Sequence, residues 1–481
     1  MKPALPSYDG LMQTTRRHFL GASALGLGAL AMRGILGEAH AAALPKGTHF
    51  PAKAKRVIYL FQAGGPSQFE TLDPKPLLRE KHQQPLPDSV RQGQRLTGMS
   101  GYQATLPLAG AFTNFKKYGQ SGVEYSDLLS HTGALADDIA VIRSMHTEAI
   151  NHDPAITFFC TGNQVAGRPS MGAWASYGLG SMNDNLPAFI VLVSQDASKD
   201  QPLYSRLWGA GFLPSEHQGV QFRAGKEPVL YLTNPEGVSP HARRGMLDAL
   251  GKLNADQRAA EFDPEVDARL AQAEMAYRMQ TSVPEVADLS KESPATLAMY
   301  GDSVKTPGSF AANCLQARRL IEKGVRFVQL FHQGWDQHGG LPGGITRQCK
   351  QTDQASAALI KDLKQRGLLD DTLVIWGGEF GRTPTVELSQ GEKVGPTLGR
   401  DHNHHGFTMW MAGGGVRGGM VHGATDEFGF KAVEKRVHVH DLHATILALL
   451  GFDHERLTYR HAGRDYRLTD VHGRVVRELI A

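Results

Sequence analysis

Six short runs of apolar residues recur along the chain, without the alternation of apolar and polar positions that a half-exposed strand shows. A strand that is buried on both faces reads as an uninterrupted apolar run, which is typical of parallel sheets covered by helices. The pattern therefore predicts buried strands at 57–61, 139–142, 189–193, 325–331, 372–376 and 407–411.

An amphipathic helix is predicted between two of these runs, over residues 352–366. Thr352 is a suitable N-cap, and Gly367 ends the pattern. A strand, a helix and a strand in this order predict a right-handed crossover and a parallel pair of strands. A second helix is predicted over 441–450. Together these elements predict a three-layer α/β/α fold with a mainly parallel central sheet.

The stretch from about 201 to 300 departs from the strand–helix pattern. A helix is predicted to begin at Pro264, because apolar residues recur on one face after it. This part of the chain is expected to be a helical insertion over the sheet, with an apolar face formed by Val266, Leu270, Ala273 and Tyr277.

The first forty residues have the order of an export signal. Arg16 and Arg17 precede a Gly/Ala-rich apolar run that is too short to span a membrane, and Ala39-His40-Ala41 is a small-x-small cleavage site. The segment resembles twin-arginine signals, whose cargo is typically exported folded. We therefore expect a signal peptide at 1–41, a domain at 42–481, the twin-arginine export machinery as a partner, and a periplasmic or extracellular mature protein without a membrane span.

Charge and cysteine content exclude some classes of function. The chain has 51 basic and 48 acidic side chains and a net charge of +3, which gives no electrostatic case for nucleic-acid binding. Three cysteines form no disulfide framework. The 21 histidines are more informative, because many of them lie between His332 and His454. His438 and His440 alternate just before the last helix, and we expect them to be structural.

Carboxylates and imidazoles gather next to several predicted strand ends. Ligands of parallel sheets bind beyond the carboxyl ends of the strands. Carboxylates and imidazoles at such an edge suit zinc, manganese or iron, and two metals about 4 Å apart can clamp the oxygens of a phosphate or sulfate ester. Two simpler interpretations stay open, since Glu379 could pair with Arg382 and Asp401 could only orient His402. The segments are 62–73, 332–340, 377–383 and 400–405.

Five motifs resemble those of the sulfatase-like domain-of-unknown-function family 1501, over nearly the whole mature chain. That family is similar to the alkaline phosphatase superfamily, which includes sulfatases and phosphatases, so the resemblance implies an alkaline-phosphatase/sulfatase-like fold. The motifs are Gly64-Gly65-Pro66-Ser67, Gly334-Trp335-Asp336-x-His338-Gly339, Gly378-Glu379-Phe380-Gly381-Arg382-Thr383-Pro384, Gly399-Arg400-Asp401-His402 and Ala412-Gly413-Gly414-Gly415.

The resemblance implies ligands for one or two divalent metal ions, whether zinc, manganese or calcium. Glu379 stands where the superfamily has a metal-binding Asp, and Phe380 replaces the His beside it. Asp336 and His338 resemble the Asp and His of the other metal, but they are two residues apart where the superfamily has four.

Two further ligand positions leave alternatives. His402 matches the late metal-binding His of the superfamily, with His405 as its competitor. The first strand lacks the usual Asp, so that Glu70 or Asp73 would have to replace it.

The resemblance also implies catalytic candidates. Thr147 follows a predicted strand where the superfamily keeps its nucleophile, and Arg382 could clamp an oxyanion. If Thr147 only caps a helix, hydrolysis would need water activated by a metal.

These residues lead to one main hypothesis, an exported metal-dependent hydrolase of phosphate or sulfate esters of small molecules or glycans. The alternative is a catalytically reduced binding protein that retains the fold and at most one metal. A redox metalloprotein would suit the export route, but the sequence has no cofactor fingerprint for it.

Overall fold

The computed structural model describes residues 47–94, 96–225, 227–230, 232–260, 264–388 and 398–481. The predicted signal peptide at 1–41 lies outside these residues. No helix within the described ranges is long and apolar enough to cross a membrane.

A nine-stranded sheet forms the centre of the described structure, in the order β12-β4-β11-β8-β1-β7-β5-β6, with β15 also paired to β4. Every strand runs in one direction except β11, which is antiparallel to both β8 and β4. All six predicted strands are confirmed. The strands are β1 (Arg56–Gln62), β4 (Ile139–His146), β5 (Phe189–Val193), β6 (Val220–Phe222), β7 (Phe327–His332), β8 (Thr372–Gly377), β11 (Phe407–Ala412), β12 (Met420–His422) and β15 (Val437–His438).

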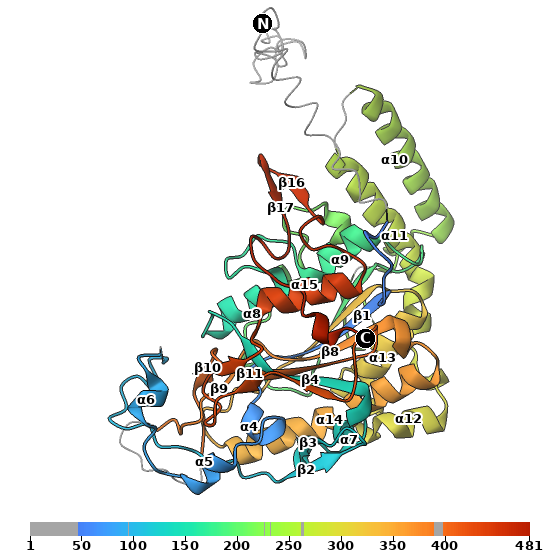
Figure 1. The fold of residues 1–481 in the computed structure, drawn as a ribbon. Helices are drawn as coiled ribbons and strands as arrows, with labels where there is room; N and C mark the ends of the chain where they lie inside the picture. The colour runs from blue at the N-terminus through green and yellow to red at the C-terminus, as the bar shows by residue number, and fades with distance from the viewer. Residues whose placement is uncertain (1–46, 95, 226, 231, 261–263, 389–397) are drawn as a thin grey trace, which may run out of the picture. The chain divides into compact units, whose positions relative to one another are not determined.

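Helices cover both faces of the sheet, which confirms the three-layer α/β/α class (Figure 1). The strands are buried on both faces, as their unbroken apolar sequences predict. Ile58 and Leu60 of β1 belong to the core that α13 and α14 close, whereas Phe61 packs on Phe159 of α8 on the opposite face. One face carries α12 (Pro294–Tyr300), α13 (Phe310–Glu322) and α14 (Leu341–Gln365), and the other carries α8 (His152–Thr161), α9 (Met171–Leu179) and α15 (Val439–Leu449).

The starts of two predicted helices are corrected. Helix α14 begins at Leu341, so Thr352 lies inside it, where its hydroxyl donates to the Gln348 carbonyl. Helix α15 begins at Val439, two residues earlier than predicted. His438 is its N-cap, and the Asp441 carboxylate accepts from the His438 backbone N–H to complete a capping box. The predicted structural role of His438 is thereby confirmed.

The range 201–300 contains two long helices, α10 (Pro240–Ala260) and α11 (Pro264–Ala287). It also supplies β6, which pairs with β5 in the central sheet, so the range is not helical throughout. The predicted face of α11 is only half-buried. The core contact comes from its second half, through Met279, Val283 and Val286.

The direction of β11 decides where the loop before it lies. The loops that follow β1, β7 and β8 leave from one edge of the sheet because these strands are parallel. The antiparallel β11 starts at that same edge, so the segment 400–406 joins those loops. Separately, β16 (Tyr459–His461) and β17 (Arg464–Tyr466) form an antiparallel hairpin.

A buried cation stabilises the α13–α14 layer. Arg318 is 1% exposed, and its guanidinium bonds to Asp362 of α14 at 2.9 Å and lies 2.6 Å from the Glu292 carboxylate. Burial would raise the pKa of Glu292, but hydrogen bonds and charge from Arg318 and Arg319 outweigh it and hold this pKa below its usual value. Arg318 is the most buried of the cations that stabilise these carboxylates, since Arg319 also pairs with Glu292 and Arg366 also pairs with Asp362.

We predict that Arg318→Met lowers the free energy of unfolding by about 3 kcal/mol at pH 7, measured by urea titration. The control Lys364→Met breaks an exposed pair with Asp138 and should cost about 0.5 kcal/mol or less. Because the folded-state pKa of Glu292 is depressed, the ionised Glu292 contributes to the free energy of unfolding above its unfolded-state pKa, and this contribution is lost as pH falls. The difference in the free energy of unfolding between wild type and Arg318→Met should therefore narrow below about pH 4. An equal decrease in the free energy of unfolding for Arg318→Met and Lys364→Met would contradict this account.

Candidate metal centre

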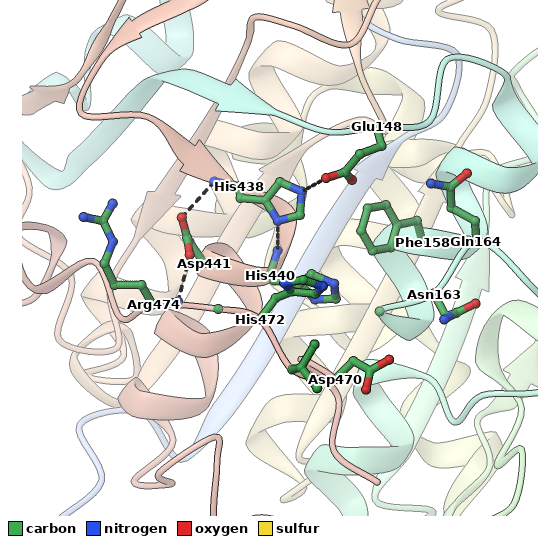
Figure 2. Close-up of a pocket in the computed structure, with 13 residues that line it drawn as sticks. Glu148, Phe158, Asn163, Gln164, His438, His440, Asp441, Asp470, His472 and Arg474 are labelled. Atoms are coloured by element: carbon green, nitrogen blue, oxygen red, sulfur yellow. Dashed lines mark hydrogen bonds and ion pairs between the residues drawn. The ribbon is translucent and has the colours of Figure 1, made fainter.

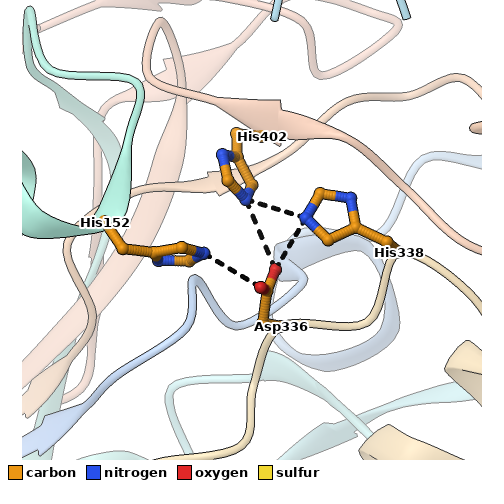
Figure 3. Close-up of side chains that lie close together, drawn as sticks. All are labelled: His152, Asp336, His338 and His402. Atoms are coloured by element: carbon orange, nitrogen blue, oxygen red, sulfur yellow. Dashed lines mark hydrogen bonds and ion pairs between the residues drawn. The ribbon is translucent and has the colours of Figure 1, made fainter. Parts of the chain in front are cut away.

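Four side chains from distant parts of the chain meet at the sheet edge (Figure 3): His152, Asp336, His338 and His402. Each offers one ligand atom, and these atoms all lie within 4.8 Å of one another. The His338 and His402 Nε2 atoms are 3.0 Å apart, and they lie 2.9 and 3.3 Å from Asp336 Oδ1. His152 Nε2 is 3.1 Å from Asp336 Oδ2. We call this set the His/Asp cluster.

The topology explains why these four residues meet. Asp336 and His338 lie in the loop after β7, and His152 is the first residue of α8, which follows β4. His402 lies in β10 (His402–Asn403), just before the antiparallel β11, and β10 pairs with β9 (Gly381–Arg382). The loops after β1 and β8 fill the space between these elements.

Close backbone packing holds the Asp336 loop in place. Gly64 has φ +118°, and a Cβ there would lie 2.7 Å from the Asp336 nitrogen and 2.8 Å from the Trp335 nitrogen. Only glycine allows the β1 turn to come this close. A Cβ at Gly399 would likewise lie 1.8 Å from the His338 carbonyl oxygen. These two glycines of the recognised motifs therefore permit the loops to pack directly against the segment that carries two of the four ligands.

Each imidazole of the His/Asp cluster is oriented by an acceptor at Nδ1. The His152 Nδ1 lies 2.6 Å from the Glu379 carboxylate, and the His402 Nδ1 lies 2.8 Å from the Ile150 carbonyl. The His338 Nδ1 bonds to Glu387. These acceptors assign a proton to every Nδ1 and turn every Nε2 toward the centre. Metal-binding histidines are typically held by such an acceptor.

Charge is shared unevenly within the cluster. Burial disfavours a charged His152, but Asp336 and Glu379 outweigh burial and raise the pKa of His152 to about 9. Burial, only partly offset by Asp336, lowers the pKa of His402 to about 4. Burial would raise the pKa of Asp336, yet the three imidazoles and Arg382 keep it well below its usual range. The centre thus favours positive charge next to Asp336 and leaves the His402 nitrogen unprotonated.

The donor set fits a divalent transition metal. Three imidazole nitrogens and one carboxylate suit zinc or manganese, whereas calcium prefers oxygen ligands. The His402 side chain is 4% exposed, but those of His152, Asp336 and His338 are 15%, 20% and 24% exposed. One side of the cluster is therefore open to a small ligand.

Glu379 and Arg382 lie beside the cluster and position its members. Glu379 is completely buried and accepts from the Gly64 backbone N–H at 2.9 Å as well as from His152, so it faces His152 and not Arg382. Arg382 is 1% exposed and donates to Asp336 Oδ1 at 2.6 Å. The same guanidinium donates to four backbone carbonyls, those of Gly64, Gly65, Trp335 and Arg400. Arg382 thus fastens the loops and Asp336 together, which corrects the expectation that it faces an oxyanion.

The structure does not bring Glu70 or Asp73 into the cluster. Helix α4 (Gln68–Thr71) directs Glu70 toward Arg400, whose guanidinium lies 2.7 Å away with both side chains buried. Asp73 lies 3.3 Å from Lys75 and accepts from the Thr425 hydroxyl at 2.5 Å. Both carboxylates form ion pairs away from the cluster, which corrects the expectation that one of them replaces the missing Asp.

Thr147 makes no side-chain hydrogen bond to the cluster among the described residues. Its backbone N–H donates to the His404 carbonyl at 2.9 Å, and its 4%-exposed side chain has no hydrogen-bond partner for Oγ1 among the described residues. Thr147 does not cap α8 either, since Asn151 is the N-cap residue. The same segment instead contributes His152, which we did not predict. The only sequence signal for it was a histidine shortly after a strand at the chemical edge of the sheet.

The remaining candidates are resolved by geometry. His402, and not His405, joins the cluster, while the His404 and His405 rings lie against each other at a tilt of 38°, with their centroids 3.9 Å apart. Asp401 Oδ1 accepts from the His402 backbone N–H at 2.7 Å, whereas the His402 ring is oriented by the Ile150 carbonyl. Asp401 also forms a second group with His338 and Glu387, whose ligand atoms lie within 4.8 Å of one another.

Another group of histidines lines a cavity of about 670 Å³ between α8 and α15 (Figure 2). His438 caps α15 and lies 2.8 Å from Glu148, and the His440 ring stacks on His472. Burial and neighbouring positive charges lower the pKa of His440 to about 2, so this ring stays neutral. These histidines are not among the groups of described residues that could hold a metal ion.

We predict that Glu379→Gln weakens zinc affinity by about 10- to 100-fold, because the amide no longer holds the His152 ring with a charged acceptor. Competition with a chromophoric chelator measures this change. Glu434→Gln, on the exposed end of β14 (Ala432–Glu434), is the matched control and should leave the affinity unchanged. Equal affinities in the two variants would show that Glu379 does not act on a bound metal.

The sequence and the structure of this chain were compared with those of known proteins. Similar solved structures include an alkaline phosphatase superfamily protein from Vibrio parahaemolyticus (12% identity, 85% of this chain and 69% of that chain, TM-score 0.35). A sulfatase from Pseudoalteromonas sp. (12%, 94% and 74%, TM-score 0.34) and a phosphonate monoester hydrolase from Silicibacter pomeroyi (14%, 73% and 71%, TM-score 0.31) are also similar. No curated protein matches the chain significantly. The profile described as "Protein of unknown function (DUF1501)" matches residues 54–480, and the chain therefore belongs to this family, as its motifs predicted.

Proposed function

We propose that this protein is an exported hydrolase of phosphate or sulfate esters that works with one divalent metal ion, zinc or manganese. The single observation that supports the proposal is the convergence of three Nδ1-anchored imidazoles and one carboxylate on a point that is partly open to solvent. His152, Asp336, His338 and His402 would be the ligands. A divalent ion supplies Lewis acidity toward an ester oxygen and toward water.

The residues around the cluster favour water as the nucleophile. Among the described residues the Thr147 hydroxyl has no hydrogen-bond partner, so it makes no such bond to the four ligands and is not held in place as the nucleophile. In the proposed reaction water attacks phosphorus or sulfur, the bond to the alcohol oxygen breaks, and one proton of the water passes to the departing alcohol. Arg382 and Glu379 keep Asp336 and His152 in position throughout.

One observation favours the alternative, a binding protein that retains a single metal. The Arg382 guanidinium is committed to Asp336 and to backbone carbonyls, and it does not face the open side of the cluster as an anion clamp would. Metal content and turnover, measured together, separate the two functions.

We predict one zinc or manganese ion per chain, by elemental analysis of the protein expressed with its signal. Hydrolysis of nitrophenyl phosphate, bis-nitrophenyl phosphate or nitrophenyl sulfate should accompany the metal. His338→Ala should lose at least tenfold in metal affinity and roughly a hundredfold in turnover, because it removes a direct ligand. His241→Ala, an exposed histidine on α10, is the control and should change neither. Metal without turnover on any ester would establish the binding protein instead.

We also propose that the twin-arginine signal exports the folded protein to the periplasm or beyond. The double variant Arg16→Lys/Arg17→Lys should leave the uncleaved precursor in the cytoplasm, as judged by fractionation and immunoblotting. Its metal content should equal that of the wild type, because the metal ligands lie outside the signal. Unchanged export of the variant would contradict this route.

A further inference from the structure

A polar cavity of about 720 Å³ lies at the same edge of the sheet as the His/Asp cluster, beyond β5, β6 and β7. Its lining combines amide side chains with three aromatic rings, those of Tyr204, Trp208 and Phe222. Amides both donate and accept hydrogen bonds, as sugar hydroxyls require, and aromatic rings pack against apolar C–H faces. The amide side chains are those of Gln195, Gln201, Gln221 and Gln333.

Two buried polar atoms in this lining have no partner among the described residues. The Gln201 side chain is 3% exposed and its Nε2 is unsatisfied, and Ser194 is 5% exposed with an unsatisfied hydroxyl. Buried donors without a partner are rare in folded proteins, since each costs free energy. Both atoms belong to residues that line the cavity, which points to a polar ligand there.

The cavity shares a wall with the metal ligands. The Gln201 backbone carbonyl accepts from Gln333 Nε2 at 2.6 Å, and its side-chain oxygen accepts from the Gly334 backbone N–H at 2.8 Å. Gly334 is two residues before Asp336, so their Cα atoms are within about 7.6 Å of each other. At the other end of this wall, Arg206 pairs with Asp153, the neighbour of His152. The segment 201–206 therefore contacts both the loop that carries Asp336 and the start of α8, which carries His152.

The charges of the lining favour an anionic ligand. Lys199 and Arg223 are exposed, and no ion pair joins either of them to a described carboxylate. Asp200 is the single carboxylate among the lining residues, so the two cations outnumber it.

We infer that this cavity binds an acidic saccharide, which is the alcohol portion of the ester that the His/Asp cluster hydrolyses. Binding of an acidic saccharide does not depend on the proposed function. Its identity as the alcohol portion of the hydrolysed ester does. The glutamines and Ser194 bond to the sugar hydroxyls, the aromatic rings pack on the sugar ring, and Lys199 and Arg223 pair with its acidic group.

Calorimetric titration with trigalacturonic acid and with its neutral methyl ester tests the inference. We predict that wild type binds the acid about tenfold more tightly than the ester, before and after treatment with a chelator. Lys199→Ala/Arg223→Ala should abolish this preference, whereas Lys117→Ala/Lys361→Ala, which removes two exposed charges elsewhere, should keep it. Ser194→Ala should weaken both ligands roughly fivefold. Ser126→Ala, which removes another unsatisfied buried hydroxyl outside the cavity, should have no effect.

Absence of binding by either sugar, equal binding of both, or equal affinities in the cavity variants and their controls would overturn the inference. Binding requires neither a metal nor turnover, so it is separable from the proposed function. Ester turnover without saccharide binding would remove only the saccharide site. Saccharide binding by a protein without turnover would support the site and leave the hydrolase without support.

Discussion

The orientation of three imidazole rings is the constraint on which the rest of the site depends. Each ring of His152, His338 and His402 is fixed by an acceptor at Nδ1, and each therefore directs Nε2 at the same point as the Asp336 carboxylate. Four acceptor atoms this close need positive charge among them, because buried like groups repel and unpaired carboxylates are costly. Asp336 and Glu379 outweigh burial and raise the pKa of His152 to about 9, which favours a protonated imidazole there. A divalent cation would displace that proton and satisfy all four groups at once.

The sheet and the loops at its edge hold the four side chains of the cluster in this geometry. The single antiparallel strand β11 brings His402 to the edge at which β7 delivers Asp336 and His338. Arg382 then joins loops that follow different strands by donating to their carbonyls and to Asp336. A residue with this many partners is better suited to hold loops together than to follow a substrate through a reaction.

Much of this architecture was predictable from sequence, for physical reasons. Buried strands produce unbroken apolar runs, so every major strand was found, and the carboxyl-end rule placed Asp336 and His338 at one edge. His402 precedes its strand, and it reaches this edge only because β11 is antiparallel. The misses came from features that only the fold determines. Glu70 was expected near the metal, but a short helix turns it toward Arg400. His152 was overlooked because nothing in its local sequence separates a ligand from an ordinary histidine at the start of a helix.

The position of a bound zinc ion tests the central claim most directly. A crystal structure of the zinc-loaded protein, with anomalous data collected at the zinc edge, should show one ion within about 2.0–2.2 Å of three Nε2 atoms and one Asp336 oxygen. An ion held by other residues, or zinc-soaked crystals with no anomalous peak between His152, His338 and His402, would contradict the account.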